Sequence, residues 1–117
     1  MRFTLVPKVF FDTLEQGFDL FVDALRFEVK YQDDGFAVVE RNGAKAYIVA
    51  SPEFAAKDRP EIAIETDAID ALHADIAARR RDLLHPNLPD VTLRPWGARE
   101  FALRDATDVC IVFRQFD

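Results

Sequence analysis

The residue best suited to chemistry in this 117-residue chain is its single tryptophan, Trp96, which lies between Pro95 and Gly97. Proline and glycine favour a tight turn, and this turn precedes an alternating run that contains Phe101 and Leu103. An indole in such a place either packs onto the core or offers its face to a flat ligand by stacking. The residues alone leave both alternatives open.

Residues that carry catalysis are sparse. Cys110 lies in an alternating apolar segment, which is typical of a small buried side chain rather than of a nucleophile. The chain has no Gly-x-Ser-x-Gly elbow and no glycine-rich phosphate loop, and it contains only 4 glycines. We expect His73 on the solvent side of a helix and His85 in a loop. These features argue against an enzyme.

Size and composition limit the remaining functions. A chain of 117 residues, of which 50% are hydrophobic and 11 are phenylalanine, is expected to form one globular domain over residues 1–117. The net charge of −6 argues against nucleic acid and suits a cationic small molecule. No apolar run approaches the roughly 20 residues of a membrane span, and no signal peptide is recognisable. The single cysteine suits a reducing compartment, so we expect a cytoplasmic protein without membrane association.

The first half of the chain has the pattern of a strand, a helix and three further strands. Pro7 marks an edge or a bend in the first strand, because proline cannot donate a ladder hydrogen bond. Asp12 and Glu15 are expected to cap the helix that follows. Asn42 and Gly43 form a strong type I′ hairpin signal. The predicted elements are strands over residues 3–11, 27–31, 36–40 and 46–50 and a helix over residues 14–25.

The second half repeats this order after a polar linker over residues 51–60. Asp67 is expected to cap its helix, in which Ile69, Leu72 and Ile76 face inward. The predicted strands cover residues 61–65, 91–93, 100–104 and 109–113.

The sequence therefore predicts an α+β fold built from two βαβββ modules, at about residues 1–51 and 60–117. Neither module can cover the concave face of its own sheet. We therefore expect the two curved mixed sheets to enclose a cleft.

Residues 94–105, Arg-Pro-Trp-Gly-Ala-Arg-Glu-Phe-Ala-Leu-Arg-Asp, closely resemble a late strand of the bleomycin resistance proteins, which belong to the glyoxalase-like, or vicinal oxygen chelate, superfamily. Two further segments support the resemblance. Leu25-Arg26-Phe27 stands where that family has Leu-Gly-Phe, and the run from Asp34 to Val39 stands where it has an aspartate-rich turn followed by Phe-Ala. The resemblance covers nearly the whole chain and implies the same duplicated fold.

The resemblance also implies a binding function without turnover, in which two aromatic rings hold a planar cationic antibiotic of the bleomycin type. The matching positions are Phe36 and Trp96, although Phe36 is equally compatible with a place in the core. Tyr47 and Phe101 are further candidates for lining the same groove, and Asp33, Asp34 and Glu61 are candidates for pairing with the cationic tail.

Metal enzymes of the superfamily take ligands from the first strand, from the strand that opens the second module and from the last strand. The matching positions hold Leu5 or Val6, Glu61 and Val112. One donor among three cannot hold a catalytic metal ion, so we expect neither a metal nor another cofactor. A metal-dependent lyase or dioxygenase of this fold and a metabolite-binding module remain the alternatives.

The family further implies a homodimer in which the N-terminal strand crosses to the partner, with Pro7 as its hinge. Three departures from the family pattern are visible: Arg26 replaces a glycine, Ala98 is an additional residue, and residues 105–109 lack the usual proline and glycine. Either that last turn has another geometry, or Asp108 adopts an unfavourable backbone angle.

Overall fold

The computed structural model describes residues 1–117, and the backbone divides into two units, Met1–Arg59 and Pro60–Asp117. Each unit contains one four-stranded mixed sheet in which the first strand pairs in parallel with the last. The predicted α+β class with its repeated order of strand, helix and three strands is therefore confirmed. The cleft and the dimer remain predictions.

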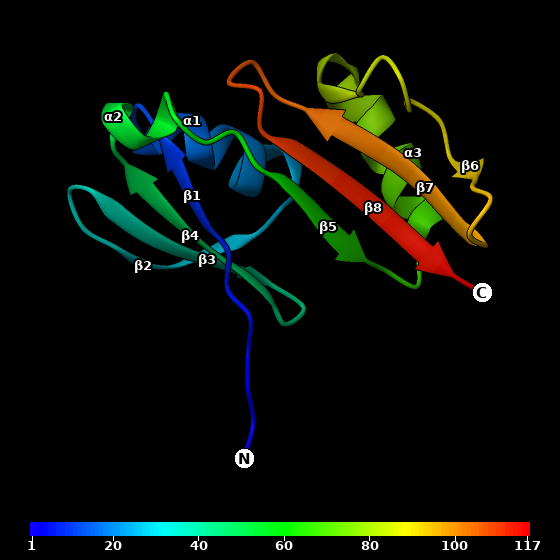
Figure 1. The fold of residues 1–117 in the computed structure, drawn as a ribbon, viewed down its shortest axis with the longest axis horizontal. Helices are drawn as coiled ribbons and strands as arrows, with labels where there is room; N and C mark the ends of the chain where they lie inside the picture. Colours follow the sequence, from blue (N-terminus) through cyan, green and yellow to red (C-terminus); the bar gives the residue numbers. More distant parts are fainter. The chain divides into compact units, whose positions relative to one another are not determined.

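In the first unit the strand order is β1-β4-β3-β2, and the helices follow β1 and β4 (Figure 1). The elements are β1 (Lys8–Phe11), α1 (Leu14–Phe18), the π-helical η1 (Asp19–Ala24), β2 (Glu28–Gln32), β3 (Phe36–Arg41), β4 (Ala44–Ala50) and α2 (Pro52–Ala55). Asn42 and Gly43 join β3 to β4 with φ of 51° and 88°. Both angles are positive, as a type I′ hairpin requires.

Helix α1 packs directly on its own sheet at Gly17. A Cβ atom built on Gly17 would lie 2.5 Å from Cγ2 of Ile48 and 3.1 Å from Cδ2 of Phe11, so only glycine allows this approach. The face of the sheet that carries Ile48 is therefore the core face of the unit. Its fully buried neighbours include Val9, Phe11, Leu20, Phe21, Ala37 and Val39.

The cap of α1 lies one residue later than predicted. Thr13, not Asp12, is the N-cap, and its hydroxyl accepts a hydrogen bond from the Gln16 backbone N–H. The Gln16 side chain in turn accepts from the Asp12 N–H, so Gln16 takes the place expected for Glu15. The helix then widens into η1 and ends before Arg26, whose φ of 58° is left-handed, as the glycine in the family pattern suggested.

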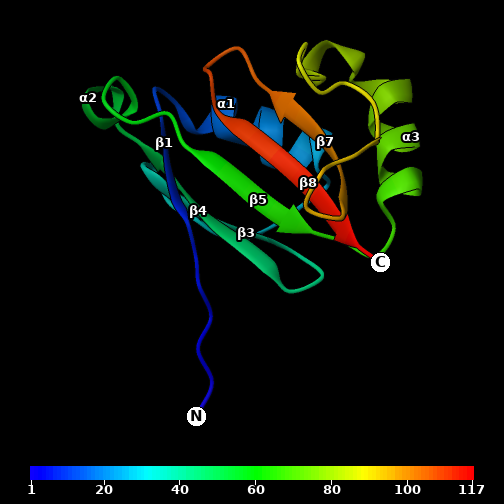
Figure 2. The ribbon, with the colours of Figure 1, turned by 45° about the vertical axis from the view of Figure 1, so that its right-hand side comes forward.

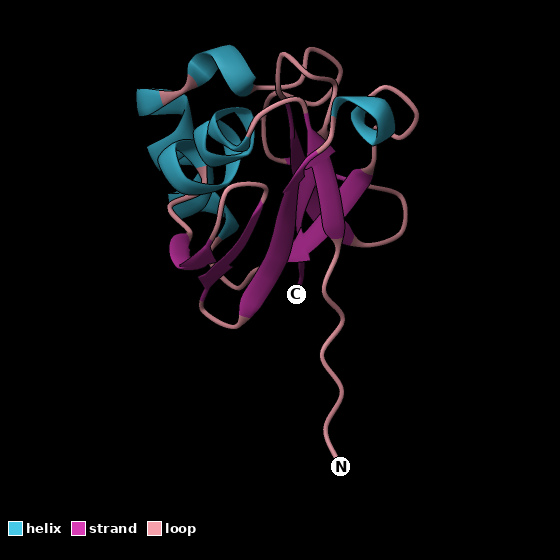
Figure 3. Ribbon diagram, turned by 90° about the vertical axis from the view of Figure 1, so that its left-hand side faces the viewer, coloured by secondary structure: helices cyan, strands magenta, loops and turns pink.

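The first strand is shorter than predicted, because β1 begins only at Lys8. Residues 1–7 form an arm that runs away from the sheet of its unit, and Figure 3 draws it as loop. Pro7 is the last residue of this arm, and its carbonyl oxygen accepts a hydrogen bond from the Tyr47 N–H of β4.

In the second unit the strand order is β5-β8-β7-β6, and Figure 2 shows α3 lying along one face of this sheet. The elements are β5 (Glu61–Glu65), α3 (Ile69–Arg79), the 3₁₀-helical η2 (Arg81–Leu83), β6 (Thr92–Leu93), β7 (Ala98–Arg104) and β8 (Cys110–Phe116). Buried side chains between α3 and the sheet include Ile69, Ile76, Phe101, Leu103, Ile111 and Phe113.

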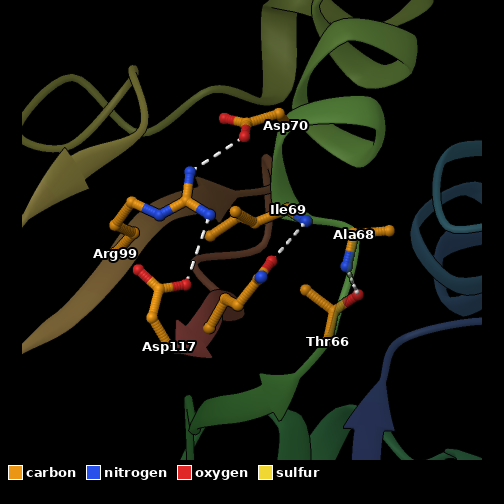
Figure 4. A network of polar contacts seen from close by, with 7 residues as sticks. Thr66, Ala68, Ile69, Asp70, Arg99 and Asp117 are labelled. Atoms are coloured by element: carbon orange, nitrogen blue, oxygen red, sulfur yellow. Dashed lines mark hydrogen bonds and ion pairs between the residues drawn. The ribbon is translucent and has the colours of Figure 1, made fainter.

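The start of α3 is fixed by residues other than Asp67. Ala68 is the N-cap, Thr66 Oγ1 accepts from the Ala68 N–H, and the Gln115 side chain accepts from the Ile69 N–H (Figure 4). Arg99 on β7 bridges Asp70 and Asp117, with N–O distances of 2.8 and 3.6 Å. None of the helices combines the length and hydropathy that a membrane-spanning helix needs.

Candidate functional site

Trp96 lies in a tight turn between β6 and β7. The Gly97 N–H donates to the Arg94 carbonyl at 2.9 Å, and the Arg94 N–H donates to the Ala98 carbonyl at 2.8 Å. Gly97 has a φ of 90°, a conformation that side chains other than glycine rarely adopt. The Pro-Trp-Gly sequence therefore forms the predicted turn, and the indole at its tip is 54% exposed.

The exposed indole is nevertheless held in place by two neighbours. Its Nε1–H donates to Oε2 of Glu100 at 2.7 Å. The guanidinium carbon of Arg94 lies 4.9 Å from the ring centroid, a cation–π contact over one face of the indole. The ring is thus ordered along one edge and against one face while half of its surface stays in solvent.

Glu100 was not predicted, yet it is the centre of this cluster. It is only 3% exposed, and its Oε2 also accepts from Nε of Arg114 at 2.6 Å. Burial opposes its ionisation, but the hydrogen bonds from Arg114 and Trp96 outweigh burial and lower the pKa of Glu100 below its usual value. The sequence signal is the antiparallel pairing of Glu100 with Arg114, which becomes visible only once the register of β7 and β8 is known.

Phe101 does not line a groove, contrary to the prediction. It is fully buried, stacks on Phe113 at 5.3 Å and meets the ring of His73 at 4.9 Å. The reason is strand alternation: Phe101 faces α3, so its neighbour Glu100 faces the other way. The prediction that His73 lies on the solvent side of its helix is also wrong. Its ring packs on this core, and its Nε2 lies 2.8 Å from the Pro89 carbonyl oxygen.

In the first unit the structure brings Phe36 and Tyr47 together, with ring centroids 5.3 Å apart. Both lie on the face that points away from α1, because their strand neighbours Ala37 and Ile48 are buried on the α1 side. Tyr31, a residue that the sequence analysis missed, extends the cluster, with its ring 6.1 Å from that of Phe36. Both Phe36 and Tyr47 are partly exposed, so neither is a core residue of this unit.

The predicted carboxylates differ in how freely they can meet a cation. Asp33 accepts from the Gly35 N–H and from the Tyr31 hydroxyl, each at 3.0 Å, and these bonds lower the pKa of Asp33. Asp33 therefore shapes the turn and orients Tyr31. Asp34 and Glu61 are exposed carboxylates at the surface of their units.

The positions that match metal ligands in related enzymes carry no ligand set. Leu5 is 96% exposed in the arm, and Val112 is a buried apolar residue of β8. No group of three His, Cys, Asp or Glu side chains converges in the structure. Cys110 pairs with Glu61 across β8 and β5 and is partly exposed rather than buried as predicted. Desolvation and the charge of Glu61 raise the pKa of Cys110, so its thiolate is disfavoured.

The predicted aromatic residues that remain accessible lie in both units: Phe36 and Tyr47 form a ring pair in the first, and Trp96 lies in the second. Among the other candidates, Asp33 and Asp34 lie in the turn before β3 and Glu61 is the first residue of β5, whereas Phe101 lies in the core of the second unit. The pairing of Phe36 with Trp96 around one ligand stays a prediction.

No protein-family model matches the chain, and no curated protein matches it by sequence. Solved structures do match it over its whole length. A bleomycin-binding protein from bleomycin-producing Streptomyces verticillus, in complex with copper(II)-bleomycin, is 27% identical and superposes with a TM-score of 0.76, covering 100% of this chain and 99% of the other.

Two other structures are more distant in sequence. A bleomycin resistance determinant encoded on the transposon Tn5 is 15% identical, with a TM-score of 0.79 over 99% of each chain. A glyoxalase/bleomycin resistance protein/dioxygenase from Alicyclobacillus acidocaldarius is 16% identical, with a TM-score of 0.75 over 96% of this chain and 89% of the other. The chain therefore has the fold of the glyoxalase and bleomycin resistance proteins, and the resemblance that the tryptophan segment indicated is confirmed.

Proposed function

We propose that this protein binds and sequesters a planar cationic antibiotic of the bleomycin type and releases it chemically unchanged. The observation that carries the proposal is Trp96, a half-exposed indole on a tight turn whose edge and one face are fixed by Glu100 and Arg94. A large ring kept ordered in solvent is suited to stacking on a flat guest. The similarity in fold and sequence to a bleomycin-binding protein supports the same ligand class.

The binding energy must come from several sources. Micromolar affinity corresponds to about −8 kcal/mol. A pair of aromatic rings contributes about 0.5–1.5 kcal/mol beyond area burial. Stacking on Trp96 and Phe36 is therefore insufficient alone, and burial of the guest against Tyr47 and Tyr31 must add to it. Asp34 and Glu61 are the exposed carboxylates that would pair with the cationic tail, with Asp33 ordering the turn beside them.

We also propose that the protein is not an enzyme. Related metal enzymes need donor side chains at positions where this chain has the apolar Leu5 or Val6 and Val112. The raised pKa of Cys110 disfavours its use as a nucleophile at neutral pH.

We further propose that two copies associate, each lending its arm of residues 1–7 to the other. Met1, Phe3 and Leu5 occupy alternate positions. Their solvent-accessible areas, relative to those of free residues of the same type, are 112%, 88% and 96%. In an extended chain alternate side chains share a face, so the arm presents an apolar stripe that a partner could bury.

A fluorescence titration tests the binding function. Metal-free bleomycin added to the protein is expected to quench the emission of Trp96 and to saturate at one guest per site, because the indole is the sole tryptophan and stacks on the guest. Calorimetry on Trp96→Ala should show at least a tenfold weaker complex, about 1.4 kcal/mol.

Leu93→Ala provides the matched control. Leu93 is 70% exposed and lies three residues before Trp96, so loss of its side chain should leave the affinity unchanged. Unaltered emission at high micromolar bleomycin would remove this antibiotic class as the ligand.

A further inference from the structure

We propose that Glu100 is the positioning residue of the aromatic site: it holds the Trp96 indole in the orientation that receives the guest. This inference rests on the proposed function, because it assigns a role within the same site. Glu100 itself is 3% exposed and is not placed in contact with the guest.

The hydrogen bond to Glu100 decides which way the indole points. An exposed tryptophan on a turn can rotate about two side-chain bonds, and only one edge of its ring carries an N–H group. The bond of 2.7 Å from Nε1 to Glu100 Oε2 fixes that edge. With the edge fixed, the Arg94 guanidinium covers one face of the ring, and stacking is left to the opposite face.

Glu100 can act as an anchor because it is itself immobile. It lies in β7 directly opposite Arg114 of β8, and the Arg114 Nε–H donates to the same carboxylate oxygen at 2.6 Å. The carboxylate is almost excluded from water, so solvent competes little for the indole N–H. Hydrogen bonds to an ionised acceptor are also stronger than neutral ones. The sheet therefore sets the position of a ring that lies on a turn outside it.

An ordered ring improves affinity because it loses little freedom on binding. Ordering one mobile side chain at an interface weakens association by roughly two- to tenfold. We expect Glu100→Gln to cause a loss within this range. The amide can still accept the indole N–H, but it lacks the negative charge that strengthens the bonds from Trp96 and Arg114.

A double-mutant cycle with metal-free bleomycin, measured by calorimetry, tests the assignment. Glu100→Gln should weaken binding about two- to tenfold in the natural background. In the Trp96→Phe background, where no N–H remains to be anchored, the same change should have no effect. Glu53→Gln is the matched control, because that glutamate side chain is 70% exposed on α2 and should leave binding unchanged in both backgrounds.

Time-resolved fluorescence anisotropy of the free protein provides a second readout that needs no ligand. The single indole should show a larger fast component in Glu100→Gln than in the natural protein. Arg114→Gln should show the same, because it frees the carboxylate from its second donor; its side chain is partly exposed, so the fold should tolerate the change. Circular dichroism of each variant checks that it is folded.

Equal losses of affinity in the natural and Trp96→Phe backgrounds would overturn the proposal, since Glu100 would then act on the guest or the fold directly. Unchanged anisotropy in both folded variants would overturn it as well. If bleomycin fails to bind the natural protein, the proposed function fails, and the anisotropy alone decides whether Glu100 orders the indole.

Discussion

At the scale of single residues, the turn between β7 and β8 shows how side chains replace a missing proline and glycine. Oδ1 of Asp105 accepts hydrogen bonds from the Thr107 N–H, the Thr107 hydroxyl and the Val109 N–H, at 2.7–3.0 Å. These bonds give the polar groups of the turn their partners and hold the backbone in a shape in which Asp108 has a φ of 68°. Of the two geometries that the sequence left open, the unfavourable backbone angle is therefore the one adopted.

The strained position in this turn gives a first prediction. Asp108→Val should lower the free energy of unfolding by about 1–3 kcal/mol, because a β-branched side chain is poorly accommodated at positive φ. Asp108→Asn is the control and should stay within about 0.5 kcal/mol, since asparagine tolerates this region. Urea denaturation measures both, and equal stabilities of the valine and asparagine variants would contradict the assigned strain.

Residue identity also explains why the site was only partly predictable. Trp96 was visible because a lone tryptophan between proline and glycine is conspicuous. Glu100 and Phe101 were harder, because an alternating pattern shows that neighbours face opposite ways without showing which face is the core. Phe101 was predicted to line the groove, but its neighbour Glu100 is the residue that faces Trp96. The prediction was therefore wrong by one position along the strand.

At the scale of elements, helix α1 lies close to β4 only because residue 17 has no side chain. Alanine would gain about 1 kcal/mol of helix propensity at an ordinary helical site. At Gly17 its Cβ would meet Ile48 Cγ2 at 2.5 Å, and overpacking of this kind costs about 1–3 kcal/mol. Contact between helix and sheet therefore outweighs local preference at this position.

Gly17→Ala is accordingly expected to lower the free energy of unfolding by up to about 2 kcal/mol, which is the overpacking cost less the gain in helix propensity. Gly35→Ala is the matched control: no atom lies within 4 Å of a Cβ at Gly35, so the change should stay within about 0.5 kcal/mol. Thermal unfolding followed by circular dichroism compares the two. A Gly17→Ala variant more stable than the natural protein would show that the helix can shift to make room.

The helices and strands were predicted more accurately than the residues at which they begin and end. Asn42 and Gly43 fixed the hairpin between β3 and β4, because few residues adopt two consecutive positive φ angles. The predicted cap of α1 was wrong by one residue, since Asp12 and Thr13 are adjacent and both residue types cap helices well. The Gln115 side chain that caps α3 is 46 residues away in sequence, beyond the reach of a local pattern.

At the scale of the whole molecule, both units repeat one strand order, with a first strand paired in parallel to the fourth. This repetition could be predicted from the order of the helices and strands, although the two halves of the chain have almost no sequence identity to each other. The length of β1 could not be predicted, because residues 3–11 are the same apolar, β-rich run whether the segment pairs within its own chain or with another chain.

The proposed exchange of arms predicts a change of oligomeric state. Light scattering should give the mass of a dimer for the natural protein and of a monomer, or a dimer that dissociates on dilution, after deletion of residues 1–7. Phe3→Ser/Leu5→Ser should weaken association while keeping the arm, because it removes the apolar stripe. Arg2→Ser/Thr4→Ser, at the intervening positions, is the control that should stay dimeric. A stable dimer after deletion would count against exchange.

Strand β2 lies at an edge of its sheet, and all 5 of its residues are exposed, among them Val29 and Tyr31. An unpaired edge with apolar side chains is a template for fibril growth. Here the register shifts between Val29 and Tyr31, and the shift places Lys30, paired with Glu28 at 3.0 Å, in the middle of the strand. We therefore expect the irregularity and the charge at this point to disfavour pairing of this edge with a strand of another molecule.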